Sequence, residues 1–228
     1  NRFGGTCLDF GSGHGTDVLL VKSMGVSCLG FEPYRIDTHT DEIHRPTSVA
    51  GIRQVLAAIA DGIAFDTIFQ GSILNSVPFR ADRELIVKLV ASICTDKTMV
   101  YACAAAEGIP THLASQGKAA PNQGTESLTT FALDYEPGIA LSDLTAKAKV
   151  QKYHTRAEWL ELWQLGFEKV LMGKCPGNIT GCEASGPRVT AADVKAAIEF
   201  EFDLPYPDGQ RMGLVAEAKA AWRKWAAI

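Results

Sequence analysis

Residues Leu8–Asp17 read Leu-Asp-Phe-Gly-Ser-Gly-His-Gly-Thr-Asp, and they predict a strand, a tight turn and the start of a helix. Three glycines alternate in the turn, and because glycine has no Cβ the backbone there can adopt positive φ and lie close to a ligand. A second predicted strand, Ser27–Phe31, is followed directly by Glu32. The stretch therefore predicts an α/β fold with a ligand site at the carboxyl ends of its strands.

Glu32 is placed to bind a ribose. Both oxygens of one carboxylate can accept hydrogen bonds from the two vicinal hydroxyls of a sugar, and each such bond contributes about 1.5–3 kcal/mol. Together with the glycine turn, this acid predicts a site for a cofactor that contains adenosine. A simpler alternative is that the glycines only close a turn and that Glu32 is a solvated loop acid.

The spacing of the glycines separates two kinds of cofactor. A dinucleotide site has Gly-x-Gly-x-x-Gly, with the helix N-terminus facing a pyrophosphate. Here the third glycine comes one residue early and Asp17 follows it. A carboxylate at the helix start would repel a pyrophosphate but tolerates a sulfonium and an amino group, and Asp9 favours the same choice.

The arrangement Asp9-x-Gly11-x-Gly13-x-Gly15, with Glu32 after the second strand, resembles the first two motifs of the class I S-adenosylmethionine-dependent methyltransferases. This resemblance implies a Rossmann-like, seven-stranded, mostly parallel α/β sheet with helices on both faces. It also implies that S-adenosylmethionine binds at the carboxyl ends of the first, second and fourth strands. The residues expected to bind it are Asp9, Gly11, Ser12, Gly13, Gly15, Glu32, Pro33, Gln70, Gly71 and Ser72.

Two residues are candidates for catalysis. The segment Asn75–Phe79 resembles the Asn-Pro-Pro-Phe/Tyr signature of amino-methyltransferases, although the first proline is missing and one residue is extra. By that resemblance Asn75 would accept a hydrogen bond from the target amine; alternatively it only turns the chain into the next helix. His154 is expected at a strand end facing the cleft, where it could act as a base. Its alternative role is to bond the start of the following helix.

Further contacts to the acceptor or to adenosine are expected from Tyr34, His112 and Tyr153. The four tryptophans occur in pairs at helical spacing, which is more typical of core packing than of base stacking.

Apolar spacing predicts the other elements of the first half of the chain. Helices are expected from Thr16 to Met24, over Ile52–Ile63 and over Ala81–Ile93, and strands over Phe65–Gln70 and Thr98–Cys103. The third strand of the family has no clear counterpart, and Thr47–Val49 is the best candidate for it.

Residues 104–149 are expected to form a long insertion that contains a strand-like segment, Leu128–Leu133. Insertions of this length are typical of lids and binding loops. The core is expected to resume at Val150–His154. Thr155 and Glu158 then predict a capping box for a helix through Leu165.

Phe167–Met172 is the expected final strand, and in the family the last strand runs antiparallel. Residues 173–228 are expected to form a C-terminal extension, irregular over Cys175–Arg188 and then helical over Ala191–Phe200 and Leu214–Trp225. The domain expected to bind S-adenosylmethionine therefore spans residues 1–172.

Composition limits the remaining possibilities. A net charge of −4 disfavours a broad phosphate-binding surface, because binding to duplex nucleic acid needs many Lys and Arg contacts. The six cysteines show no Cys-x-x-Cys pair, so we expect free thiols and no metal site. There is no apolar run of about 20 residues, which argues against a membrane span and favours the cytoplasm. Since the chain starts seven residues before the turn, it is expected to be a fragment or one domain of a larger protein.

These observations favour a methyltransferase that acts on a small molecule or a nucleobase amine. Two alternatives remain open: an NAD(P)-dependent oxidoreductase, and a non-catalytic nucleotide-binding module of a larger protein.

Overall fold

The computed structural model describes residues 4–106, 120–121, 129–142, 149–175 and 177–226. The expected contact residue His112 lies outside these ranges.

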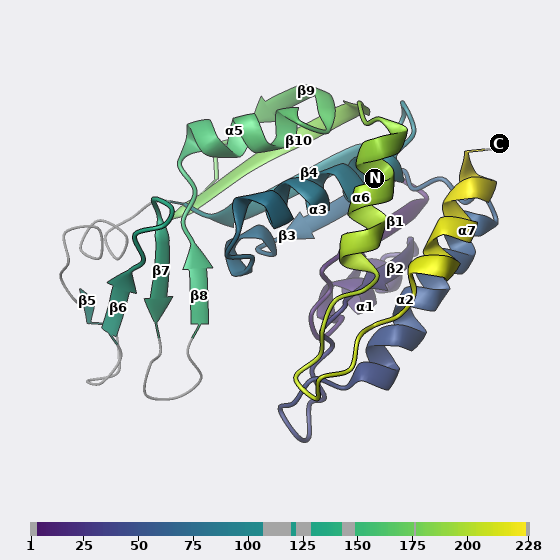
Figure 1. Cartoon of the computed structure of the whole chain (residues 1–228). Helices are drawn as coiled ribbons and strands as arrows, with labels where there is room; N and C mark the ends of the chain where they lie inside the picture. Colours follow the sequence, from purple (N-terminus) through teal and green to yellow (C-terminus); the bar gives the residue numbers. More distant parts are fainter. Residues whose placement is uncertain (1–3, 107–119, 122–128, 143–148, 176, 227–228) are drawn as a thin grey trace.

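A six-stranded sheet forms the centre of the molecule, in the order β2-β1-β3-β4-β10-β9 (Figure 1). Its first four strands are mutually parallel: β2 (Ser27–Phe31), β1 (Thr6–Phe10), β3 (Thr67–Gly71) and β4 (Met99–Ala105). Strand β10 (Ile179–Pro187) runs antiparallel to β4 and to β9 (Phe167–Met172). The predicted class, a mostly parallel α/β sheet, is confirmed, with six strands instead of seven.

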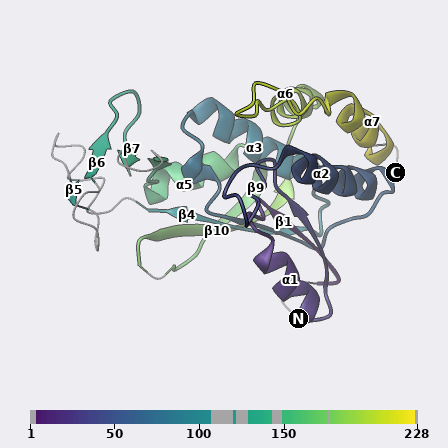
Figure 2. The ribbon, with the colours of Figure 1, turned by 90° about the horizontal axis from the view of Figure 1, so that it is seen from below.

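Helices cover the two faces of this sheet unequally (Figure 2). On one face α1 (Thr16–Ser23) is the only helix among the described residues, and its Val18 and Val21 pack there against Cys7 and Cys28. The other face carries α2 (Arg45–Ala60), α3 (Arg80–Ser92), α5 (Arg156–Gln164), α6 (Ala191–Glu201) and α7 (Val215–Trp225). The main core lies beneath these helices; in it the rings of Phe10 and Phe31 stack with centroids 4.5 Å apart.

The prediction of a third strand at Thr47–Val49 is wrong, because these residues lie in the first turns of α2. Pro46 stands in the first turn of this helix, where proline fixes φ and a missing N–H costs nothing. The position beyond β2, where a seventh strand would pair, is therefore an open sheet edge within the described ranges.

The final strand was also assigned wrongly. Strand β9 is parallel to the first four strands, and the reversed strand is β10, in a segment predicted to be irregular. Glycine, serine and proline weaken the strand signal of β10. Packing favours glycine at position 181, since a Cβ there would lie 2.8 Å from Sγ of Cys175 and 3.0 Å from the carbonyl oxygen of Ala102 on the neighbouring strand. Burial between two strands outweighs the weak local preference.

The insertion forms a second, four-stranded antiparallel sheet of β5 (Ala120–Pro121), β6 (Thr129–Ala132), β7 (Ile139–Ser142) and β8 (Lys149–Lys152). The segment expected to return to the main sheet at Val150 therefore belongs to this smaller sheet instead. The main unit resumes at α5 (Arg156–Gln164), whose predicted Thr155–Glu158 capping box is confirmed.

The two C-terminal helices, α6 and α7, lie close to their predicted bounds. Thr190 and Asp193 form a second capping box at the start of α6. These helices pack on α3 and α2 and continue the layer over the main core. The division of the chain at residue 172 stays a prediction, although β10 lies beyond it in the main sheet.

Candidate functional site

The glycine turn has the predicted backbone geometry. Gly11, Gly13 and Gly15 all have positive φ, of 88°, 50° and 76°, and Gly15 caps the start of α1. At Gly11 a Cβ would lie 1.6 Å from Cδ1 of Ile73, so a larger residue would displace the Ile73 side chain and would strain a backbone with positive φ. At Gly13 a Cβ would meet nothing within 4 Å, so the turn faces open space there.

The carboxylate of Glu32 points at this turn. Its Oε2 accepts a hydrogen bond from the Gly13 N–H at 2.7 Å, and its Oε1 accepts one from the Tyr34 N–H at 2.9 Å. A carboxylate has about four lone-pair positions. Both oxygens therefore keep the capacity to accept further hydrogen bonds from a ligand, and the side chain is held toward the bend.

A pocket of about 510 Å³ lies at the carboxyl ends of β1, β2 and β3. It brings together five residues predicted to be in the site, namely Gly11, Glu32, Pro33, Tyr34 and Ser72. Ser72 has a φ of 58°, which is uncommon for a residue with a side chain, and such strained positions cluster at functional sites. Apolar walls are supplied by Phe10, Ile86, Phe200 and Leu204.

The charge of this pocket is negative. Three carboxylates line it, those of Glu32, Asp82 and Glu201, and its described lining contains no Lys, Arg or His. Burial and the nearby charges of Glu32 and Asp82 raise the pKa of Glu201 to about 8. Its Oε2 has no hydrogen-bond partner among the described residues, although the side chain is only 4% exposed.

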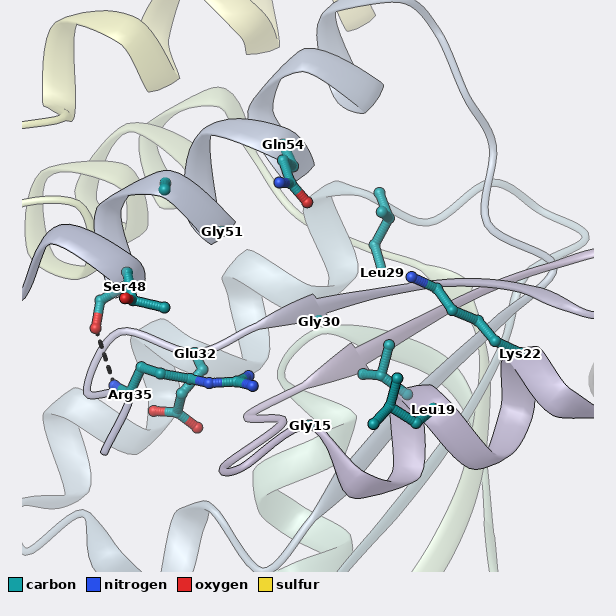
Figure 3. Close-up of a pocket in the computed structure, with 13 residues that line it drawn as sticks. Gly15, Leu19, Lys22, Leu29, Gly30, Glu32, Arg35, Ser48, Gly51 and Gln54 are labelled. Atoms are coloured by element: carbon teal, nitrogen blue, oxygen red, sulfur yellow. Dashed lines mark hydrogen bonds between the residues drawn. The ribbon is translucent and has the colours of Figure 1, made fainter. Parts of the chain in front are cut away.

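Glu32 also borders a second groove, of about 290 Å³, along the open edge of β2 (Figure 3). The groove runs between Leu19 and Lys22 of α1 and Gly51 and Gln54 of α2.

Arg35 lies at one end of this second groove, where its guanidinium packs against Gly15 and donates to the carbonyl of His14 at 2.8 Å. The backbone N–H of Arg35 donates to the Ser48 hydroxyl at 2.9 Å, which fixes the loop after β2.

Asp9 does not line the 510 Å³ pocket. It is 4% exposed and faces the α1 side of the sheet, in a separate cavity of about 190 Å³ with Asp17 and Phe69. Burial, followed by the charges of Asp17 and Glu32, raises the pKa of Asp9 to about 6. The side chain of Ser12 is buried against Gly30 on the same side. Contact of Asp9 and Ser12 with the cofactor stays a prediction.

Three residues predicted to be in the site do not line the pocket. Gln70 and Gly71 are the last residues of β3, and Asn75 lies in the short helical turn Leu74–Ser76 that follows. Neither polar atom of the buried Gln70 amide has a partner among the described residues, and the same holds for Oδ1 of Asn75. Gly71 lies against the ring of Phe69, where a Cβ would be 3.0 Å from two ring carbons. The neighbours of Asn75, Ser76 to Pro78, do line the pocket.

His154 lies apart from the 510 Å³ pocket. It is 1% exposed, its ring meets that of Trp159 edge-on, and it borders a cavity of about 20 Å³ beside Arg83 and Lys152. Burial, followed by the charges of Lys152 and Arg83, lowers the pKa of His154 to about 3. A base for chemistry near neutral pH needs a pKa closer to 7, so this environment favours a structural role.

The two tyrosines expected at the site differ in position. The hydroxyl of Tyr34 donates to the Pro205 carbonyl at 3.0 Å, and its ring packs edge-on against Tyr206. Burial and the charge of Glu201 raise the pKa of Tyr34 to about 12. The backbone N–H of Tyr153 donates to the Gly138 carbonyl in the insertion, and Tyr153 does not line the pocket.

The acids Asp82 and Glu201 were missed in the sequence. In α6 the buried or half-buried positions Val194, Ala197, Ile198 and Glu201 follow helical spacing, so Glu201 occupies an apolar stripe. A carboxylate on such a stripe is a signal of a buried charge. Its approach to Glu32 depends on packing between distant segments, which no local pattern reveals.

The described part of the chain has neither a cluster of metal ligands nor a membrane-spanning helix. All six cysteines are free, and Cys103 and Cys175 are partly exposed. The described residues contain no group of three or more His, Cys, Asp or Glu side chains that could hold a metal ion. No helix in the described ranges has the length and apolar character needed to cross a membrane.

Comparison with known proteins supports the fold. No profile of a protein family and no curated protein matches the sequence. Among solved structures, the PH0226 protein from Pyrococcus horikoshii OT3 aligns with a TM-score of 0.52 and 12% identity over 81% of this chain and 82% of that chain. An S-adenosylmethionine-dependent methyltransferase from Clostridium acetobutylicum ATCC 824 aligns with a TM-score of 0.51 and 7% identity, over 81% and 85%. The CcbJ methyltransferase from Streptomyces caelestis aligns with a TM-score of 0.52 and 11% identity over 81% of this chain and 85% of that chain. The chain therefore has the class I Rossmann-like methyltransferase fold.

Proposed function

We propose that this protein is an S-adenosylmethionine-dependent methyltransferase. The observation that carries the proposal is the position of the Glu32 carboxylate, which is fixed against the glycine turn and borders a pocket of about 510 Å³. Pockets for small ligands and cofactors have volumes of about 300–1,000 Å³. Glu32 would hold the ribose, and the turn at Gly11–Gly15 would receive the amino-acid tail.

The charge of the pocket supports this choice of cofactor. S-adenosylmethionine carries a sulfonium and an amino group, both positive, whereas a dinucleotide brings a negatively charged pyrophosphate. The pocket offers three carboxylates and no basic side chain among its described lining residues. Asp17 adds an acid in the first turn of α1, where a pyrophosphate would need to bind. The guanidinium of Arg35 also lies at this turn, but it donates to the carbonyl of His14 and borders the other groove. The acidic lining of the 510 Å³ pocket therefore disfavours the NAD(P)-dependent alternative.

When bound, S-adenosylmethionine supplies a methyl group on a sulfonium, and transfer then depends mainly on holding donor and acceptor in line. Ser72 and the segment Ser76–Pro78 line the pocket and would contact the acceptor. A small molecule or a nucleobase amine stays the proposed acceptor. Asn75 lies directly beside this segment and stays a candidate for acceptor contact.

Calorimetric titration with S-adenosylhomocysteine, the demethylated product, tests the proposal. We expect saturable binding and a rise in Tm, with no response to NADH. If millimolar S-adenosylhomocysteine produces no binding heat and no thermal shift, the proposal that this protein is a methyltransferase is refuted. Binding of NADH alone would favour an oxidoreductase.

A further inference from the structure

The carboxylates of Asp82 and Glu201 are not explained by a cofactor held at Glu32 and the glycine turn. Asp82 comes from the first turn of α3 and Glu201 from the last turn of α6, and these two helices pack against each other. Both side chains line the same pocket as Glu32. The pocket therefore has an acidic wall built from parts of the chain more than a hundred residues apart.

Glu201 is the informative member of this wall. Its side chain is 4% exposed, and its Oε2 has no hydrogen-bond partner in the described part of the chain. An unpartnered buried polar group destabilises a fold, so an acid kept in this position suggests a ligand that pairs with it.

The net charge of the cofactor does not balance the pocket. S-adenosylmethionine has a sulfonium, an ammonium and a carboxylate, and thus one net positive charge. Glu32 and Asp82 can carry two negative charges in the pocket, and Glu201 adds a third only when it ionises. A second cation beside Glu201 would stabilise that third charge, because a buried charge is stable only when it is paired.

The walls around the acids indicate what else this second ligand carries. Phe10, Ile86, Phe200 and Leu204 line the same pocket, so the ligand would combine a positive group with an apolar or aromatic body. A buried carboxylate with apolar walls selects an ammonium over a hydroxyl of the same size, because only the ammonium pairs with the charge.

We infer that the methyl acceptor is an amine with an apolar body, which Glu201 and Asp82 bind as an ammonium; this inference rests on the proposed methyltransferase function. Glu201 would accept the hydrogen bond of the ammonium, and one proton could pass from nitrogen to the carboxylate. That transfer leaves a neutral amine, whose lone pair is then free, and a neutral carboxylic acid.

Proton release on binding provides a specific signature. In the free protein the charges of Glu32 and Asp82 act on Glu201 and favour its protonated form, and the Tyr34 hydroxyl also interacts with Glu201. An ammonium that binds beside Glu201 favours the ionised form instead. Binding of an amine near neutral pH should therefore release a proton that Glu201 held.

The experiment uses calorimetry on the whole chain, first with S-adenosylhomocysteine and then, on the saturated protein, with benzylamine, phenethylamine and tryptamine. Benzyl alcohol and 2-phenylethanol are the uncharged analogues. Each amine titration is repeated in phosphate and in Tris, because the difference in heat between these buffers measures proton release. The variants are Glu201→Gln and Asp82→Asn. Glu199→Gln is the control, since Glu199 is exposed on the same helix and pairs with Lys219.

We expect the amines to bind at least about tenfold more tightly than the alcohols, a difference of about 1.4 kcal/mol. Glu201→Gln should remove this preference and the proton release, while S-adenosylhomocysteine binding stays unchanged. The inference is overturned if amines bind no better than alcohols. It is also overturned if neither Glu201→Gln nor Asp82→Asn changes the affinity for the amines. It is also overturned if Glu201→Gln weakens S-adenosylhomocysteine instead, which would assign Glu201 to the cofactor. Failure of the parent to bind S-adenosylhomocysteine would refute the proposed function separately.

Discussion

The backbone N–H of Gly13 donates to Oε2 of Glu32 over 2.7 Å, which ties the glycine turn after β1 to the end of the neighbouring strand β2. Two segments that would bind different parts of one cofactor are thus held in register before any ligand arrives. This preorganisation lowers the entropy lost on binding.

The first prediction concerns this acid. Glu32→Ala should weaken S-adenosylhomocysteine binding by about 10–100-fold, because it removes one or two charge-assisted hydrogen bonds to the ribose. Calorimetric titration measures the loss. Glu42→Ala is the matched control, since Glu42 is an exposed acid in the loop that follows. Equal affinities of the Glu32→Ala variant and the parent would exclude Glu32 from the site.

The second prediction concerns Gly11. Gly11→Ala places a Cβ against the side chain of Ile73 at a residue with a φ of 88°. Strain of this kind costs about 1–3 kcal/mol, so the variant should show a lower Tm and lose S-adenosylhomocysteine binding.

Gly25→Ala separates the two causes of that strain. Gly25 has a φ of 79°, but a Cβ there meets nothing within 4 Å, so only the backbone penalty applies. The double variant Gly11→Ala/Ile73→Ala should recover part of the lost stability. If both single glycine variants lose the same stability, the contact with Ile73 contributes nothing.

How far the sequence predicts this fold depends on whether the signal is local. The turn at Gly11–Gly15 and the capping boxes at Thr155 and Thr190 are local, and the structure contains all three. Strand β10 was missed because its residues have weak strand preference, and it is stabilised by pairing with β4 and β9.

The candidate site also contains both residues with a local sequence signal and residues that only tertiary packing brings together. Glu32 was identified because its distance from the glycine turn is a sequence property. Glu201 lies more than a hundred residues away, and only the packing of α6 against α3 brings it to the pocket. His154 was expected to face the cleft because it follows a strand, but that strand belongs to the smaller sheet and the imidazole is buried.

The third prediction is a pH dependence of stability. The pKa of Glu201 is raised from 4.5 to about 8 in the folded protein, so the folded state binds more protons than the unfolded state between these values. Stability therefore falls as the pH rises through this range, by at most about 4–5 kcal/mol, since one pKa unit corresponds to about 1.4 kcal/mol.

Glu201→Gln removes this titration. Urea unfolding at several pH values should show a variant that gains stability relative to the parent as the pH rises from about 5 to about 8. For the exposed control Glu199→Gln the difference from the parent should stay constant over that range. A constant difference for Glu201→Gln would mean that Glu201 ionises normally in the fold.

The fourth prediction concerns how the insertion is attached. Arg83 of α3 is 2% exposed and forms an ion pair with Glu136 of the insertion, while it also donates to the carbonyls of Val77 and Pro78. Val77 and Pro78 line the pocket, so one guanidinium connects the pocket wall to the second sheet. Glu136→Ala leaves this buried charge without its carboxylate, which should cost about 3–5 kcal/mol in urea unfolding.

The pair Arg80–Glu84 on the same helix, with side chains 57% and 32% exposed, is the control, because a solvated pair at this spacing contributes only about 0.3–0.5 kcal/mol. Glu84→Ala should therefore unfold almost like the parent. If Glu136→Ala also costs less than about 1 kcal/mol, solvent reaches Arg83 and the ion pair does not hold the insertion against the pocket. A large loss of stability together with unchanged S-adenosylhomocysteine affinity at low temperature would show that the link stabilises the fold without shaping the cofactor end of the pocket.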